Sequence, residues 1–316
     1  MGEPAFRMSS TATPLGPPAA AQAGDEAPPE PDGWRDGQSR TLSALRDELD
    51  RLDDALHDLL MERARVVERV AQSGKRSALR PGRQAAIMRR LVTRHTGMLP
   101  VAAVVRMWQE MLAGTTAMQT PFSLAVCAPG GDSRYVQVAR ENFGALTPLR
   151  VHASAAHAVA EVRAGSAVVA VLPVPSDTEE PREAWWMWLL RPGTPAIQVV
   201  ARLPLWAPRP EGAPDVEALV VAAAKPDASG LDRSLIGLEL SLDVSRARLG
   251  TMLAAARLAP TQVILRRDPG APVADALVEV EGFVTEDDPR LAEIGLVLQR
   301  PVVLGAYAVP LEGVGP

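Results

Sequence analysis

The sequence predicts a multidomain protein: an all-α helical part first, then a small α/β lobe, then an α+β sandwich. Three observations predict this class. Residues 42–70 carry apolar side chains at alternating spacings of three and four, the period of one buried helix face. Residues 122–174 alternate short apolar runs with helical segments, as parallel α/β units do. Residues 216–310 contain several strand-like runs around an amphipathic helix.

Three helices are predicted within residues 39–120: the first at about residues 40–73, the second at 83–95, and the third from Pro100 to just before Pro121. The apolar stripe runs along the whole first helix, which two shorter helices of the same chain cannot cover. We therefore expect an intertwined dimer in which two copies of the first helix pack together.

The elements change after residue 121. We expect a parallel α/β lobe and linker at residues 121–214 and a final unit of one sheet against two helices at residues 215–316. Trp185, Trp186 and Trp188 are interpreted as the packing surface of an interface or lid. Residues 1–38 are rich in Pro, Ala, Gly and Ser without a period, which predicts a disordered tail.

Composition excludes several kinds of function. The net charge of −5 disfavours a nucleic-acid binder. Cys127 is the single cysteine, and the four histidines match no metal-ligand spacing. No apolar run approaches the roughly 18 residues of a membrane span, and no signal-peptide core is present. We expect a cytoplasmic protein without a metal or a cofactor.

Arg63 occupies a position of the stripe that the period assigns to a hydrophobic residue. A buried guanidinium needs an anion, which is either a carboxylate of another helix or a bound ligand. Arg46 lies 17 residues earlier, about 26 Å along the helix axis, so both cannot clamp one small molecule within a chain. An antiparallel second copy brings Arg63 of one chain beside Arg46 of the other and forms two equivalent pockets.

Other polar residues fall on inward or near-inward helix faces. With Arg46 and Arg63, the candidate site contains Lys75, Arg83, Gln84, Thr115 and Gln119. Several cations without evident acidic partners indicate an anionic ligand such as a dicarboxylate.

The first helix reads LRDELD at 45–50, LD at 52–53, LL at 59–60 and ER at 62–63. This pattern resembles the all-α chorismate mutases, intertwined helical dimers that convert chorismate to prephenate without a cofactor. The resemblance covers about residues 42–119. It implies that Arg46, Arg63, Arg83 and Thr115 bind substrate, with Arg63 supplied by the other subunit, and that Gln119 meets the substrate's ether oxygen.

Two positions depart from the family pattern. The family's catalytic lysine aligns with Gly74, and Lys75 is one residue late. The family's glutamate, which holds the substrate hydroxyl, is Gln84 here; an amide can still accept and donate a hydrogen bond but carries no charge. A chorismate mutase is therefore the leading interpretation. The alternatives are a non-catalytic sensor of chorismate or aromatic ligands, a dimerisation module, and an isochorismate pyruvate-lyase, which no residue favours.

The remainder resembles a reduced first lobe of prephenate dehydratase followed by an ACT domain. The matching segments are LAVCAPGG at 124–131, VVAVLPV at 168–174, VEVEGF at 278–283 and VVLGAY at 302–307. The family's Thr-Arg-Phe motif is absent, because Ala201-Arg202-Leu203 occupies that region, and we expect no dehydratase activity. The ACT-like part implies either an aromatic amino-acid effector or a dimerisation role.

Overall fold

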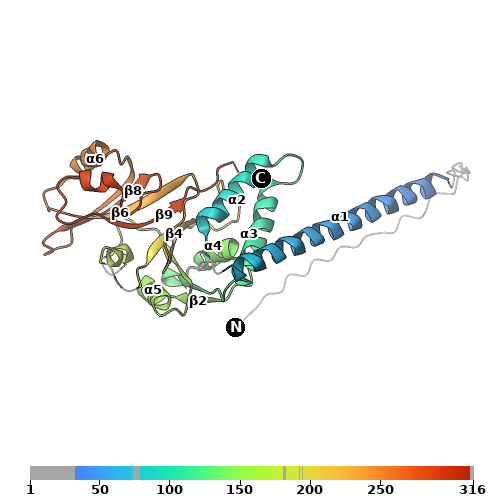
Figure 1. Ribbon diagram of the computed structural model, residues 1–316, viewed down its shortest axis with the longest axis horizontal. Coiled ribbons are helices and arrows are strands. Elements are labelled where there is room, and N and C mark those ends of the chain that lie inside the picture. Colours follow the sequence, from blue (N-terminus) through green and yellow to red (C-terminus); the bar gives the residue numbers. More distant parts are fainter. Residues whose placement is uncertain (1–32, 74–78, 181–182, 192, 194, 314–316) are drawn as a thin grey trace, which may run out of the picture. The chain divides into compact units, whose positions relative to one another are not determined.

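The computed structural model describes residues 33–73, 79–180, 183–191, 193 and 195–313, with side chains from residue 41 onward (Figure 1). The described chain separates into two compact units, one ending at Met61 and the other beginning at Glu62. The helical part contains α1 (Gly33–Gln72), α2 (Pro81–Arg94) and α3 (Val101–Ala117), so the three predicted helices are confirmed. Since α1 begins at Gly33, the predicted tail is wrong for residues 33–38; residues 1–32 lie outside the described part.

The apolar stripe of α1 is exposed. Its leucines and valines have fractional exposures between 43% and 62%: Leu42, Leu45, Leu49, Leu52, Leu56, Leu59, Val66 and Val70. Fully burying one such side chain is worth about 1.5–3 kcal/mol, so the stripe carries a large unused driving force for association.

Helices α2 and α3 pack through Met88, Val105 and Leu112, which are buried. Trp206 and Leu311, from distant parts of the chain, complete this cluster. Pro81 occupies the first turn of α2, where its missing N–H costs nothing. Residues of the sheet region therefore cover one side of the α2–α3 pair.

In the part of the chain that the structure describes, nine strands form a single sheet in the order β2-β1-β3-β5-β4-β9-β6-β8-β7. The strands are β1 (Leu124–Cys127), β2 (Leu149–His152), β3 (Val169–Pro173), β4 (Gln198–Leu203), β5 (Ala218–Ala222), β6 (Asp232–Leu240), β7 (Pro260–Arg266), β8 (Ala274–Glu281) and β9 (Val302–Ala308). Strands β1, β2 and β3 are parallel, as predicted. Helices α4 (Arg134–Phe143) and α5 (Ala155–Arg163) belong to this predicted lobe.

The lobe and the final unit share this sheet, which the sequence did not predict. Strand β5, which the sequence assigned to the final unit, instead lies between β3 and β4 of the lobe and pairs with both, so the predicted boundary at residue 215 is wrong. The rest of the final unit joins the lobe through the parallel pairing of β4 with β9, seen side by side in Figure 1, where Val199 faces Gly305. A Cβ on Gly305 would lie 2.1 Å from the carbonyl oxygen of Val199, and its φ of +140° disfavours other residues. Glycine at position 305 therefore permits the approach of the two backbones.

From β6 onward, the final unit follows the predicted order of elements. Helix α6 (Arg246–Ala255) lies between β6 and β7, and the short 3-10 helix η3 (Pro289–Glu293) precedes β9. Ser245 caps α6 by accepting a hydrogen bond from the backbone N–H of Arg248. Leu249 and Leu253 of α6 are buried against the sheet with Leu291 of η3.

Two of the tryptophans predicted to form an interface or lid surface lie in the core instead. Trp185 and Trp186 lie in the short 3-10 helix η2 (Trp185–Leu189) and are 2% and 1% exposed within the single chain. The indole of Trp185 donates to the carbonyl oxygen of Pro173, and that of Trp186 to a carboxylate oxygen of Glu179. With both indole N–H groups satisfied, these two residues form core rather than an interface.

A buried carboxylate links the strands around the β4–β9 connection. Glu279 of β8 is 4% exposed and pairs with Arg202 of β4 and Arg233 of β6, at N–O distances of 3.1 and 2.9 Å. Thr261 and Tyr307 also donate hydrogen bonds to it. Burial and the adjacent carboxylate raise the pKa of Tyr307 despite Arg202, so this phenol stays protonated as a donor.

Within the described ranges, no helix is long and apolar enough to cross a bilayer, and no group of His, Cys, Asp or Glu side chains could hold a metal ion.

Cys127 gives a test of the fold. It is 2% exposed at the end of β1, and burial, with a smaller contribution from Glu183, raises its pKa to about 11. This value exceeds the roughly 8.5 of an unfolded thiol, so the thiol's contribution to stability is complete below about pH 8.5 and is lost as the pH rises toward 11. We expect slow alkylation by iodoacetamide at pH 8 and fast alkylation in urea, measured by mass spectrometry. Equal rates in the two conditions would contradict the buried position.

Candidate active site

The last turns of α1, the start of α2 and the end of α3 converge in the second unit. Arg63 Nη1 donates to Thr115 Oγ1 over a long 3.4 Å, between residues 52 positions apart. The Thr115 hydroxyl itself donates to backbone carbonyls of its own helix, that of Met111 at 2.9 Å or that of Leu112 at 3.1 Å. Thr115 therefore holds the Arg63 guanidinium through an acceptor lone pair.

Arg63 is half-buried, and burial lowers the pKa of its guanidinium. In the part of the chain that the structure describes, no carboxylate lies within 4.0 Å of it. The sequence allowed two partners for Arg63, a carboxylate of another helix or a bound ligand. The described chain does not provide the carboxylate, so the ligand interpretation is the one that still applies. A half-buried cation whose partner is a hydroxyl is suited to receive an anion.

Gln84 and Gln119 each donate a hydrogen bond to a threonine near the end of α3. Gln84 Nε2 donates to Thr116 Oγ1 at 3.4 Å, and Gln119 Nε2 donates to the backbone oxygen of Thr115 at 3.1 Å. An amide carries two N–H hydrogens and a carbonyl oxygen, so both side chains keep capacity for a ligand. Thr116, which is 6% exposed, was not among the residues predicted from the sequence, although it directly follows Thr115 on α3.

The structure does not bring every predicted residue to this cluster. The Arg83 side chain is exposed, without a hydrogen bond or ion pair in the described chain. Arg46 belongs to the first unit and is exposed. Lys75 and Gly74 lie outside the described residues.

The start of α2 is held by a residue that no sequence pattern singled out. Asp227, in the loop between β5 and β6, accepts hydrogen bonds from the backbone N–H groups of Gly82 at 2.9 Å and Arg83 at 3.0 Å. It also pairs with Arg80 Nε at 3.1 Å. Helix α2 has no side-chain cap of its own, so this distant carboxylate satisfies N–H groups that a helix start leaves open.

Another α2 residue, Arg89, donates hydrogen bonds to the same loop and to the residue that follows β9. The Arg89 guanidinium donates to the carbonyl oxygens of Ser229 at 3.1 Å, Val309 at 3.4 Å and Leu231 at 3.5 Å. A Cβ on Gly82 would lie 1.9 Å from the carbonyl oxygen of Asp227, so only glycine allows this approach. The sheet region thus fixes the helix that carries Arg83 and Gln84.

The described cluster therefore contains one half-buried guanidinium, that of Arg63, beside the hydroxyl and amide groups of α2 and α3. Residues 45–120 match the family model described as chorismate mutase type II, and this segment is a domain of that family. The chain is also similar to two enzymes described as bifunctional chorismate mutase/prephenate dehydratase. The relative from Stutzerimonas stutzeri is 29% identical over 146 residues and that from Pseudomonas aeruginosa 31% identical over 147 residues. Each match covers 44% of this chain and only 40% of the relative.

Solved structures resemble the chain more distantly. A quorum-quenching acylase, GqqA, is 15% identical and matches 59% of this chain and 95% of its own, with a TM-score of 0.44. The prephenate dehydratase of Streptococcus mutans is 16% identical and matches 60% and 99%, also with a TM-score of 0.44.

The Asp227 cap can be tested by substitution. Asp227→Ala is expected to lower the free energy of unfolding by about 0.5–2 kcal/mol, as loss of a helix cap does. It should also speed hydrogen exchange at the amides of Gly82 and Arg83. Lys225→Ala, in the same loop and 84% exposed at its side chain, is the control and should change stability by less than about 0.5 kcal/mol. Unchanged exchange at both amides in Asp227→Ala would contradict the cap.

Proposed function

We propose that this protein is a chorismate mutase, which converts chorismate to prephenate. The observation that carries the proposal is the half-buried Arg63 guanidinium, held by Thr115 and facing no carboxylate in the described chain, within the segment that matches the family model. A dicarboxylate substrate supplies the anion that this guanidinium lacks.

The reaction is a unimolecular rearrangement: the ether C–O bond breaks while a C–C bond forms, so no group is transferred to the protein. Arg63 and Arg83 hold substrate carboxylates, which favours the compact conformer in which the reacting ends meet. Negative charge develops on the ether oxygen as its bond breaks. The second N–H of Gln119, together with Lys75, stabilises that charge.

Gln84 takes the role of hydrogen-bond acceptor for the substrate hydroxyl. Its Nε2 is directed to Thr116, which leaves Oε1 available to accept. Because an amide is uncharged, it holds the hydroxyl less strongly than a carboxylate does.

We also propose that the active protein is a homodimer formed through α1. The support is the exposed stripe from Leu42 to Val70, which a second antiparallel copy buries. The resemblance implied that Arg63 comes from the other subunit, but Arg63 contacts Thr115 of its own chain. In this arrangement Arg46 is therefore the residue that reaches the site from the partner copy, since it lies about 26 Å from Arg63 along α1.

For the sheet region we propose an ACT-like role without dehydratase activity. Elements β6, α6, β7, β8, η3 and β9 follow the order β-α-β-β-α-β, with the strands arranged β9-β6-β8-β7, which supports an ACT-like unit. Arg202 is engaged with Glu279, Tyr307 and Glu217, so it is not free to bind a substrate. An aromatic amino-acid effector remains a proposal for this unit.

The mutase proposal predicts loss of turnover in two variants. Arg63→Ala and Gln119→Ala are each expected to lower kcat/KM by about a hundredfold or more, because each removes a charge-directed donor. The measurement is chorismate consumption by the purified full chain. Arg65→Ala, an exposed arginine of the same helix, is the control and should retain activity. A Gln84→Glu variant should be faster than the parent.

Chorismate binding and consumption by the unsubstituted protein distinguish an enzyme from a non-catalytic sensor. If the parent binds chorismate without consuming it, the enzyme proposal fails in favour of a sensor. Unchanged kinetics in Arg63→Ala would reject the proposed position of the active site but not the mutase activity itself.

Introducing glutamates into the apolar stripe of α1 tests the proposed dimer. Leu49→Glu with Leu56→Glu should convert a dimer to a monomer in sedimentation experiments, since burying unpaired carboxylates is costly. Ser43→Glu with Met61→Glu adds the same charge outside the stripe and should leave the dimer intact. A parent chain that sediments as a monomer would contradict the proposal.

A further inference from the structure

Helix α2 concentrates positive charge in an acidic protein. Residues 81–117, which span α2 and α3, contain five arginines and one glutamate, a net charge of +4 with neutral histidine, whereas the whole chain carries −5. Helix α2 alone contributes four of these arginines and no acidic residue. The positive charge therefore gathers on the helix that carries Arg83, one of the proposed substrate ligands.

Three of these arginines share one face of the helix. Arg83, Arg90 and Arg94 follow one another at spacings of seven and four residues, which places them along one line, named here the arginine face. At 1.5 Å per residue, Arg90 lies about 10 Å and Arg94 about 16 Å from Arg83 along the axis. All three are exposed, so the arginine face is open to solvent.

The arginine face is not neutralised by carboxylates. None of its three side chains makes a hydrogen bond or an ion pair within the described ranges. Other exposed arginines, such as Arg134 and Arg248, each have a carboxylate within 4.0 Å. The three charges of the arginine face therefore act outward into the solvent.

A groove of about 480 Å³ lies along the second half of this face. The side chains that line it include no carboxylate: Ala86, Arg89, Arg90, Thr93, Arg94 and Ser229. The Arg89 guanidinium is held by backbone carbonyl oxygens, so its charge adds to the positive potential. Asp232, which accepts hydrogen bonds from Ser229, is only 7% exposed and does not line the groove.

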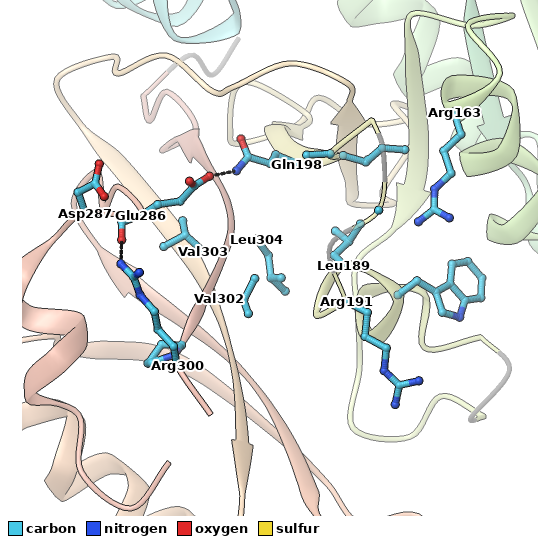
Figure 2. A pocket seen from close by; sticks show the side chains of 15 residues that line it. Arg163, Leu189, Arg191, Gln198, Glu286, Asp287, Arg300, Val302, Val303 and Leu304 are labelled. Carbon is cyan, nitrogen blue, oxygen red and sulfur yellow. Dashed lines mark hydrogen bonds between the residues drawn. The ribbon is translucent and has the colours of Figure 1, made fainter. Parts of the chain in front are cut away.

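Another cavity, of about 440 Å³ at the start of β4 and β9, has mixed charge. Figure 2 shows Glu286 and Asp287 in its lining together with Arg300. Arg300 donates to the backbone oxygen of Glu286 at 2.8 Å, and Gln198 Nε2 donates to Glu286 Oε1 at 3.1 Å. Because acids and bases alternate there, that cavity has no charge of a single sign, unlike the groove on α2.

We propose that the arginine face of α2 draws the dianionic substrate toward the mutase site by long-range attraction. This inference rests on the proposed mutase function, whose substrate carries two carboxylates. Positive charges on an open face raise the local concentration of an anion without contacting it in the bound state. Arg90 and Arg94 attract bound substrate and transition state equally, so they lower KM and leave kcat unchanged.

The size of this attraction depends on salt. The Debye length is about 30 Å at an ionic strength of 0.01 M, longer than either separation, and about 3 Å at 1 M. For a dianion beside Arg83, attraction in water to two charges about 10 and 16 Å away changes the affinity about fourfold at low salt. At 1 M salt the contribution should vanish.

The Arg90→Gln, Arg94→Gln double variant tests the attraction through initial rates of chorismate consumption by the purified full chain. Its KM should rise about fourfold at an ionic strength of about 0.01 M, with an unchanged kcat, and should equal that of the parent at about 1 M. Arg246→Gln with Arg248→Gln removes the same charge from the exposed surface of α6 and should keep the parent's KM. A parent KM in the Arg90→Gln, Arg94→Gln variant at low salt would overturn the proposal.

Lysine variants separate charge from direct contact. Arg90→Lys with Arg94→Lys keeps both charges and loses the guanidinium fork, so its KM should match that of the parent. A lysine variant as weak as the glutamine variant, or a loss that persists at about 1 M salt, would overturn steering in favour of a direct contact. If the parent binds chorismate without consuming it, the mutase function fails, and the same comparisons of Kd still decide the attraction. A parent that neither binds nor consumes chorismate overturns both proposals.

Discussion

The buried carboxylate of Glu279 is the constraint on which the sheet region depends. A carboxylate at 4% exposure is stable only while it is paired, and Arg202 of β4 and Arg233 of β6 pair with it from two sides of β9. Pulling β4 away from β9 would leave this charge without one of its two cations. The backbone pairing of β4 with β9 at Gly305 is thus reinforced by an ion network across β9.

The helical site is in turn anchored to that sheet. The β5–β6 loop supplies Asp227 to the start of α2 and backbone carbonyls to Arg89, so the chain after residue 120 orients Arg83 and Gln84. A helix that lacks a cap of its own gains one from 145 residues away. This attachment gives the sheet region a structural role for the proposed mutase even without a second activity.

Periodicity predicted most elements because it depends on local spacing. The helices, the parallel strands and most of the final unit follow from it, and so does the selection of Arg63, a charge in an apolar stripe. Strand β4 was not predicted from the sequence, because Gln198 and Arg202 obscure its apolar run, and the tryptophans were wrongly predicted to lie at a surface. Both errors concern residues whose partners, such as Glu279 and Glu179, lie elsewhere in the chain.

The sequence by itself determined which residues are helical, which face of α1 is apolar, and which polar side chains interrupt that pattern. These properties depend on neighbours within a few positions. Only the tertiary structure decided that Arg63 meets Thr115 rather than a carboxylate of the described chain, that Asp227 caps α2, and that β4 joins β9. The physical reason is that hydrogen bonds and ion pairs act over a few ångströms between groups far apart in sequence, which no periodic pattern records.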